Sequence, residues 1–272
     1  MSQRYSEFDR TAAIRCGLPI PFRGLQLYPI EMSHYDQFLA CKDALLLRLG
    51  TLPVKYLSMD YFSALFAFEV DTVKESGKSP GLFYKMITLL LLSLRIEGSA
   101  EEFCRGFHYE LVDGEPRISK IDVTQENHTE SITPFEFSLQ LRPLIAHVNG
   151  LELPDESENL DLVIANEQKK SLNAPSYRLN ATTDALIASV AYLSGCRERD
   201  VMGWTVREFE QRRSAIDREK KYMLYGQAEM SGMVTFKKGN PAPSWCYDLL
   251  DESLGTQSLS ELNFGDAKQK EN

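Results

Sequence analysis

Residues 183–232 decide the fold, and they read TDALIASVAYLSGCRERDVMGWTVREFEQRRSAIDREKKYMLYGQAEMSG. The first part of this stretch carries apolar side chains at helical spacing from Leu186 to Leu193. Thr183 and Asp184 are residue types that cap the amino terminus of a helix, and Gly195 stands where a left-handed carboxyl-terminal cap belongs. The stretch therefore predicts one compact helix at its start.

A second, much longer helix is predicted after it. Thr205 and Glu208 form a capping box, in which side chains satisfy amide donors that the first helical turn leaves unpaired. Apart from Gly226, no residue with a strong tendency to break helices follows before Gly232. We therefore predict a helix from Val206 to Met230, with a length of ~37 Å.

The apolar stripe of this long helix is predicted to be narrow. Large apolar residues recur every seven positions, and Glu, Gln, Arg and Lys dominate the positions between them. A helix that is polar over most of its circumference projects into solvent or packs against another chain. Methionine suits such a surface because its flexible thioether side chain adapts to its partner. The predicted partner-binding residues are Phe209, Ile216, Met223, Met230, Met233 and Trp245.

Composition places the chain among ordinary globular proteins. It has 272 residues, of which 43% are hydrophobic and 25% are charged, which is enough for one large or two modest cores. A net charge of -9 argues against general nucleic-acid binding, which needs a basic surface. The five cysteines form no close pair, and residues 1–10 lack an apolar signal region. We therefore expect reduced thiols in a cytoplasmic protein.

The first hundred residues predict a mainly helical region with one short strand. Prolines frame an extended piece from Gly24 to Tyr28. Helices are predicted from Ser33 to Leu49, from Met59 to Phe68 after a cap at Ser58, and from Gly81 to Ile96. The last of these is the most apolar, but its apolar run is shorter than the ~20 residues that a bilayer requires. We therefore expect a core helix and no membrane association.

Residues 101–175 interrupt the helical pattern. Strands are predicted at 107–111 and 118–123 because Asp113-Gly114 between them favours a hairpin turn. Two strands alone are marginally stable, so the hairpin needs a helix, an interface or a third strand, for which Gly24 to Tyr28 is a candidate. A helix from Thr133 to Val148, kinked at Pro143, is predicted next.

The complete prediction is a mainly α fold of helical, bundle-like domains with a small central β-hairpin. Its regions are 1–100, the helical domain with one strand; 101–175, the hairpin, a helix and an acidic linker; 176–250, the module with the long helix; and 251–272, a tail whose composition predicts disorder.

Residue types with catalytic potential do not form a recognisable motif. The four histidines are far apart and lack metal-ligand spacing. Cys104 and His108 would need an orienting group and an oxyanion site to act as nucleophile and base, and neither is visible in the sequence. The turn at Lys237-Lys238-Gly239-Asn240 lacks the spacing of a phosphate-binding loop. The expectation is a non-enzymatic protein without cofactor or metal.

DNA binding is the alternative that the sequence leaves open. Ala191, Gly195 and Val201 stand at the offsets of a helix-turn-helix, where small residues let two helices cross closely. Residues 184–232 contain eight basic and eight acidic side chains. Balanced charge predicts weak attraction to phosphate.

Five segments carry a resemblance to a known class of protein. The run from Leu18 to Ile30, then Leu52 to Leu57 leading into Tyr61 to Phe68, resembles tailed-bacteriophage tail and baseplate assembly proteins. Leu186 to Gly195, followed by Arg218 to Trp245 with its Gly-Asn-Pro turn, is similar to phage tail assembly chaperones.

The resemblance implies a mainly helical protein without catalysis. It further implies binding to the tape-measure protein or to baseplate components before tail polymerisation, and so a location in the host cytoplasm or in the virion. Docking of a second copy of the chain on the long helix is an alternative to a client there. A structural tail or baseplate subunit is an alternative within the same resemblance. The central hairpin and the length of the chain are departures from the chaperone pattern.

Overall fold

The computed structural model describes residues 7–112, 115–157, 161, 164–165, 182–232, 234–236, 239–246 and 262–264. These residues are mainly helical and also form small antiparallel sheets. The chain divides into two compact units: unit 1 comprises Met1–Leu160 with Arg199–Phe209, and unit 2 comprises Asp161–Glu198 with Glu210–Asn272.

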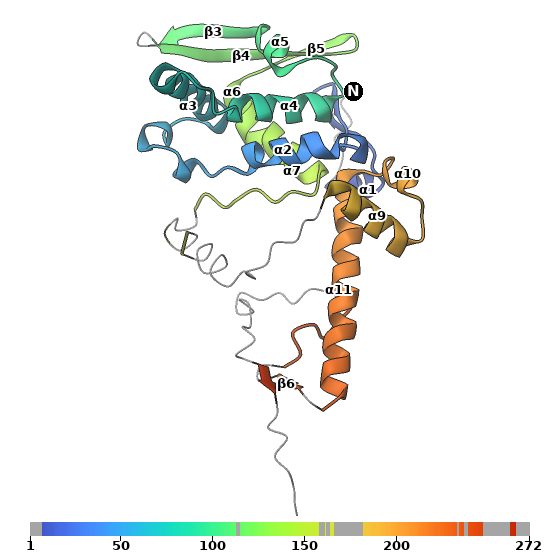
Figure 1. Cartoon of the computed structure of the whole chain (residues 1–272). Helices are drawn as coiled ribbons and strands as arrows, with labels where there is room; N and C mark the ends of the chain where they lie inside the picture. The colour runs from blue at the N-terminus through green and yellow to red at the C-terminus, as the bar shows by residue number, and fades with distance from the viewer. Residues whose placement is uncertain are drawn as a thin grey trace, which may run out of the picture. The chain divides into compact units, whose positions relative to one another are not determined.

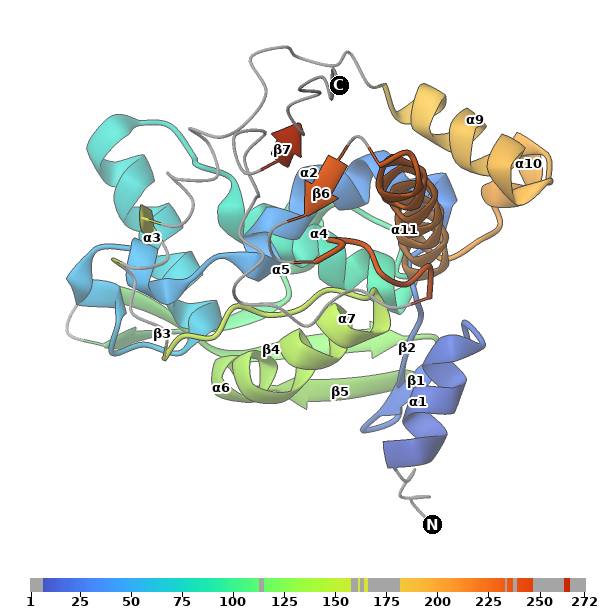
Figure 2. The ribbon, with the colours of Figure 1, turned by 90° about the horizontal axis from the view of Figure 1, so that it is seen from below.

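The centre of unit 1 is the helix α4, Leu82–Leu94, the most apolar segment of the chain. Eight of its side chains are buried, from Phe83 to Leu94. Figures 1 and 2 show α4 between the three-stranded sheet and α2, Tyr35–Leu46. Among the described residues, no helix is long and apolar enough to cross a membrane. The remaining helices of unit 1 up to residue 148 are α1 (Glu7–Arg15), η1 (Met32–His34), η2 (Leu49–Thr51), η3 (Val54–Tyr56), α3 (Tyr61–Ser76), α5 (Ala100–Cys104), α6 (Pro134–Glu136), the π-helical η4 (Phe137–Leu141) and α7 (Arg142–Val148).

The three-stranded sheet consists of β3 (Phe107–Val112), β4 (Glu115–Gln125) and β5 (His128–Ile132), in the order β3-β4-β5. One face carries buried apolar side chains, among them Phe107, Ile121 and Ile132. The third strand that the hairpin requires is β5, and the candidate segment Gly24 to Tyr28 does not fill this place. Unit 1 continues through residue 100, where a domain boundary was predicted. The sheet belongs to the same unit as the helices of the first hundred residues because it packs on them.

The segment around Gly24 forms its own hairpin instead. β1, Ile20–Phe22, pairs antiparallel with β2, Leu25–Leu27. The turn between them places Arg23 at φ 50° and Gly24 at φ 95°, in the left-handed region that glycine tolerates. The prediction of a single strand here was therefore incomplete, since three residues before Arg23 also form a strand.

The turn between α3 and α4 is built on a buried carboxylate. Glu69, 5% exposed, accepts hydrogen bonds from the backbone amides of Gly81 (2.9 Å) and Phe83 (3.3 Å) and from the hydroxyl of Ser79. These bonds satisfy amide donors at the start of α4 that have no helical partner. The predicted helix end at Phe68 was wrong, because α3 continues to Ser76 and carries Glu69 into this position.

The start of α3 also differs from the prediction. Asp60, and not Ser58, is the N-cap, and its carboxylate accepts a hydrogen bond from the Ser63 amide at 3.0 Å. Both side chains are suitable cap residues, so spacing alone did not separate them.

The helical segment from Pro134 to Val148 contains a π-helical turn. Thr133 forms the predicted capping box with Glu136. The π turn of η4 then precedes α7, in which Pro143 is one of the first residues. Proline lacks an amide hydrogen and cannot continue the regular helical bonding, so a wide turn before it accommodates the missing donor. The π turn thus stands directly before the proline at which the kink was predicted.

Residues far apart in the sequence complete unit 1. The amide of Met32 donates to the carbonyl of Trp204 at 2.9 Å, and the amide of Val206 donates to the carbonyl of Ile30 at 2.8 Å. Arg207 Nη1 donates to the carbonyl of His147 at 2.7 Å. These bonds explain why residues 199–209 belong to unit 1.

Unit 2 contains α9 (Thr183–Ser194), most of α11 (Val206–Met230), and the strand pair β6 (Val234–Phe236) and β7 (Leu262–Phe264). The N-cap of α9 is Thr182, whose Oγ1 accepts from the Ala185 amide at 3.2 Å, and not the predicted Thr183 and Asp184. Gly195 ends α9 at φ 67° as predicted. Of the tail at 251–272, only Leu262–Phe264 lies within the described residues, and there it is a strand.

Candidate partner-binding surface

The helix α11 begins and ends where its sequence signals predict. Thr205 Oγ1 accepts a hydrogen bond from the Glu208 amide at 3.1 Å. The helix runs from Val206 to Met230, and Gly232 follows it at φ 69°. The bounds therefore follow from a cap at one end and a glycine with left-handed backbone at the other.

The first residue of the predicted apolar stripe is not a surface residue. Phe209 is 0% exposed, and its ring packs edge-on against that of Tyr35 with centroids 5.3 Å apart, inside unit 1. A side chain enclosed by its own chain cannot contact a partner, so the prediction of Phe209 as a partner-binding residue was wrong. Phe209 is a core residue.

Beyond Phe209, no residue of α11 is buried. Val206 and Phe209 are its buried residues. Large apolar side chains in its second half reach solvent: Met223 is 54% exposed, Leu224 is 64% and Met230 is 90%. Ile216 is half-buried. These values leave an apolar surface in unit 2, which we call the methionine stripe and define as Ile216, Met223, Leu224 and Met230.

The segment after α11 returns along a different side of the helix. The ring of Phe236 packs edge-on against that of Tyr225 with centroids 5.6 Å apart. Asn240 Nδ2 donates to the Glu229 carboxylate at 3.0 Å, and its Oδ1 accepts from the Ala242 amide at 2.9 Å. At ~100° per residue, Tyr225 lies about 160° around the helix from Met223. The returning segment therefore leaves the methionine stripe uncovered.

The two other predicted partner-binding residues lie beyond α11. Trp245 is 62% exposed, near the end of the returning segment. Met233 lies outside the described residues. The methionine stripe thus retains Ile216, Met223 and Met230 from the prediction. It adds Leu224, which follows the heptad residue Met223 in the sequence.

The helix-turn-helix expected within residues 187–204 has a short second helix. α10, Glu198–Val201, is a single turn of four residues. A recognition helix presents several side chains to the base edges along the major groove, which one turn cannot span. This geometry gives the DNA-binding alternative no further support.

The Cys104 and His108 pair does not form a nucleophile and base. Burial raises the pKa of the Cys104 thiol to about 12, so the thiol is protonated at neutral pH. His108 Nε2 lies 2.6 Å from Asp122 Oδ2. Hydrogen bonds from His108 and then Ser131 lower the pKa of Asp122. Ser131 is also not a nucleophile activated by His108. Both side chains bond to the Asp122 carboxylate, which lies between them, so the imidazole is not placed to take a proton from the Ser131 hydroxyl.

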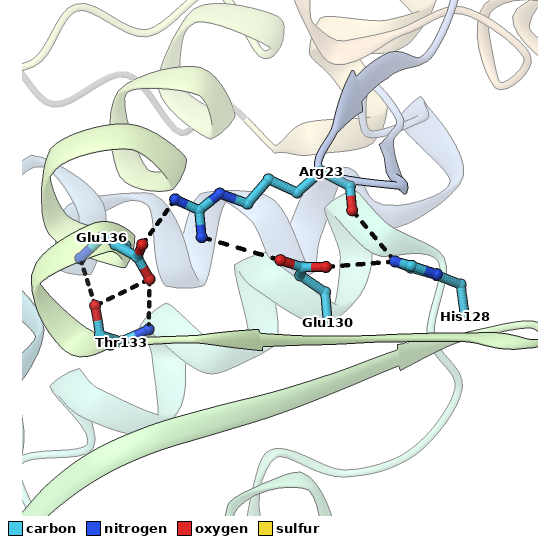
Figure 3. Close-up of polar contacts among 5 residues, drawn as sticks. All are labelled: Arg23, His128, Glu130, Thr133 and Glu136. Carbon is cyan, nitrogen blue, oxygen red and sulfur yellow. Dashed lines mark hydrogen bonds and ion pairs between the residues drawn. The ribbon is translucent and has the colours of Figure 1, made fainter. Parts of the chain in front are cut away.

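A second charged cluster ties the β1–β2 turn to the sheet (Figure 3). Arg23 Nη2 lies 2.7 Å from Glu136 Oε1, and Nη1 lies 3.9 Å from Glu130 Oε1. His128 Nε2 lies 3.2 Å from the Arg23 carbonyl oxygen and 3.4 Å from Glu130 Oε2. The hydrogen bond from Arg23, together with that from the Thr133 amide, lowers the pKa of Glu136 to about 2.

This cluster acts as a structural tether. The cation is neutralised by two carboxylates, and the turn itself lies against the His128 ring: a Cβ on Gly24 would be 2.5 Å from His128 Nε2. Among the residues that the structure describes, no group of three or more His, Cys, Asp or Glu side chains is placed to hold a metal ion. The methionine stripe is our candidate for function because its large apolar side chains are exposed.

Comparison with known proteins gives no further indication. No family model, no curated protein and no solved structure matches this chain.

Proposed function

We propose that this protein is a non-enzymatic morphogenesis factor of tailed bacteriophages, a tail assembly chaperone that binds the tape-measure protein or another tail or baseplate component through α11. The observation that carries the proposal is the exposure of the methionine stripe. Met230 alone leaves 90% of its surface to solvent. The phage assignment itself rests on the resemblance of the segments around Leu18 and Arg218.

The form of the stripe suits a helical client. Met223 and Met230 are seven residues apart, so their side chains project from nearly the same side of α11, about 20° apart. A client helix with apolar residues at matching spacing would bury them by packing alongside α11. Flexible methionine side chains accommodate more than one client geometry, as a chaperone that releases its partner requires.

The test is co-expression with the tape-measure protein of the same phage, followed by affinity purification. The variant carries Met223→Asp and Met230→Asp, and the control carries Gln211→Asp and Ser214→Asp, which add the same charge at exposed positions away from the stripe. We expect the stripe variant to lose at least ten-fold in client recovery, because two buried carboxylates cannot be accommodated in an apolar contact. Equal recovery with both variants would refute the proposal.

The neighbourhood of the gene offers an independent check. A chaperone for the tape-measure protein is expected to be encoded next to a very long, helix-rich reading frame. A location far from any tail gene would contradict the phage assignment.

A structural tail or baseplate subunit is the alternative within the same proposal. Such a subunit would remain in purified virions, whereas a chaperone would act in the host cytoplasm and be depleted from them. Mass spectrometry of purified particles separates the two. For the helix-turn-helix alternative, a gel shift with double-stranded DNA at moderate salt is decisive, and we expect no complex at micromolar protein.

A further inference from the structure

The three-stranded sheet of unit 1 has two unlike sides. On the β5 side, His128 and Glu130 contact the turn at Arg23 and Gly24, which ties the sheet to the β1–β2 hairpin (Figure 3). On the other side, β3 pairs with β4, and within the described part of the chain no further strand pairs with it. The outer edge of β3 therefore offers backbone amide and carbonyl groups to another strand.

The apolar row of β3 runs from the core out to solvent. Phe107 is 6% exposed and packs against Phe103 and Phe62. Tyr109, two residues on, is 50% exposed, and Leu111 is 78% exposed. Residues two apart along a strand point to the same face, so these three side chains form one row that is only partly covered.

The opposite face of β3 carries charge. His108 and Glu110 are both exposed, and His108 already contacts Asp122 on the neighbouring strand β4. Glu110 is paired in register with Arg117 of β4. The register shift between β3 and β4 places the extra residue, Ser119, in β4, so β3 itself keeps a regular spacing along its outer edge.

The sequence of β3 is complementary to itself in one antiparallel register. When Tyr109 lies opposite Tyr109 of a second copy, His108 falls opposite Glu110, and Phe107 falls opposite Leu111. The first of these pairs joins a histidine to a carboxylate, and the second is apolar. Cross-strand pairs of both kinds stabilise a sheet. A two-fold axis at the Tyr109–Tyr109 pair generates each of the other pairs twice, as an isologous interface requires.

We propose that two copies of this chain associate through β3, joining their three-stranded sheets into one antiparallel six-stranded sheet with Tyr109 at the two-fold axis. The pairing covers the exposed side chains of Tyr109 and Leu111. It also gives the backbone amide and carbonyl groups on the outer edge of β3 hydrogen-bond partners. A single strand pair buries less than the ~1,600 Å² of a standard interface, so the dimer forms at roughly micromolar concentrations. This association is independent of the docking role proposed for α11.

Cysteine cross-linking tests both the dimer and its register. Directly opposite residues in an antiparallel pair have Cα atoms about 4.5–5.5 Å apart, within the ~7 Å limit for a disulfide. Tyr109→Cys should therefore form a disulfide-linked dimer under mild oxidation. Leu111→Cys is the matched control, since it lies on the same strand and face but is displaced from its copy by ~13 Å along the sheet. Both variants are made with the exposed Cys16 and Cys246 replaced by serine.

The proposed register is overturned if the two cysteine variants, folded by circular dichroism, cross-link equally or not at all. The unmodified chain supplies a second measurement by sedimentation velocity from ~1 to ~100 μM. We expect a concentration-dependent dimer whose affinity falls at least ten-fold in Glu110→Arg, which places a cation opposite His108. Glu97→Arg, at an exposed position outside the sheet, should leave the affinity unchanged. A monomer throughout this range would overturn the proposal.

Discussion

Replacing Glu69 by glutamine tests how the chain closes the turn between α3 and α4. The buried carboxylate accepts two backbone amides, those of Gly81 and Phe83, and the hydroxyl of Ser79. Glutamine has the same length and shape, but one of its terminal groups is an NH₂ donor in place of an acceptor oxygen. In one orientation of the amide, its NH₂ group faces the buried N–H of Phe83 and leaves it without an acceptor. In the other orientation it faces the N–H of Gly81, which keeps a hydrogen bond to Ser79 Oγ at 3.1 Å.

The expected loss follows from these contacts. A buried donor left without an acceptor costs ~1–3 kcal/mol. The remaining bonds lose the assistance of a full negative charge, which is ~0.5–1 kcal/mol for each. The neutral amide costs less to bury than a carboxylate, which offsets part of the loss. We expect unit 1 to be destabilised by about 2–3 kcal/mol.

Urea denaturation monitored by tryptophan fluorescence measures the effect. Trp204 belongs to unit 1 and Trp245 to unit 2, so Trp245→Phe serves as the background that isolates the unit 1 signal. With a slope of ~2 kcal/mol per molar urea, the midpoint should fall by about 1 M. Glu75→Gln, at an exposed position on α3, is the control and should shift stability by less than ~0.5 kcal/mol. If Glu69→Gln behaved like this control, the carboxylate would not stabilise the turn.

Three further substitutions test other parts of unit 1. Phe209→Ala should destabilise unit 1 by ~3–5 kcal/mol in the same urea assay, because it empties a fully buried site; a folded, stable variant that only lost its partner would contradict the assignment of Phe209 to the core. Gly24→Ala should lower the free energy of unfolding by ~1–3 kcal/mol, through the positive φ and the close approach of His128, and no change would contradict the close contact. Arg23→Gln should destabilise unit 1 at pH 6, because it removes the ion pair with Glu136. Glu136 has a folded-state pKa of about 2, below its ordinary value of ~4.3, so the stability it contributes is present above the ordinary value and is lost as pH falls towards 2. The difference from the parent should therefore shrink between pH ~4.5 and ~2, and a difference independent of pH would contradict the role of the Arg23–Glu136 pair.

Local signals in the sequence predicted the elements that depend on nearby residues. The bounds of α11 follow from Thr205 at one end and Gly232 at the other, and Thr133 marks the start of the helical segment that ends at Val148. Caps and glycine stops act within one helical turn, so they are visible without a tertiary structure. Ile216, Met223 and Met230 of the methionine stripe were predictable for the same reason, because a seven-residue spacing places side chains on one side of a helix. Leu224 lies outside this spacing and was not predicted.

Elements that depend on distant partners were missed or misplaced. β5, with the sequence HTESI, has only one large apolar side chain, at Ile132, and becomes a strand because β4 lies beside it. Glu69 reads as a surface residue of α3 until the start of α4 is placed against it. Phe209 matches the heptad positions of Ile216 and Met223, and its burial depends on Tyr35, which is far away in the sequence.

The sequence by itself determined that the chain is mainly helical, where the longest helix begins and ends, and that much of its surface is polar. Only the tertiary structure decided that Ile30 and Met32 hydrogen-bond to residues 204–206, which draws the first turn of α11 into unit 1 and leaves its second half exposed. The physical reason is that these bonds join backbone groups, which every residue other than proline carries alike, so no pattern of side chains records them.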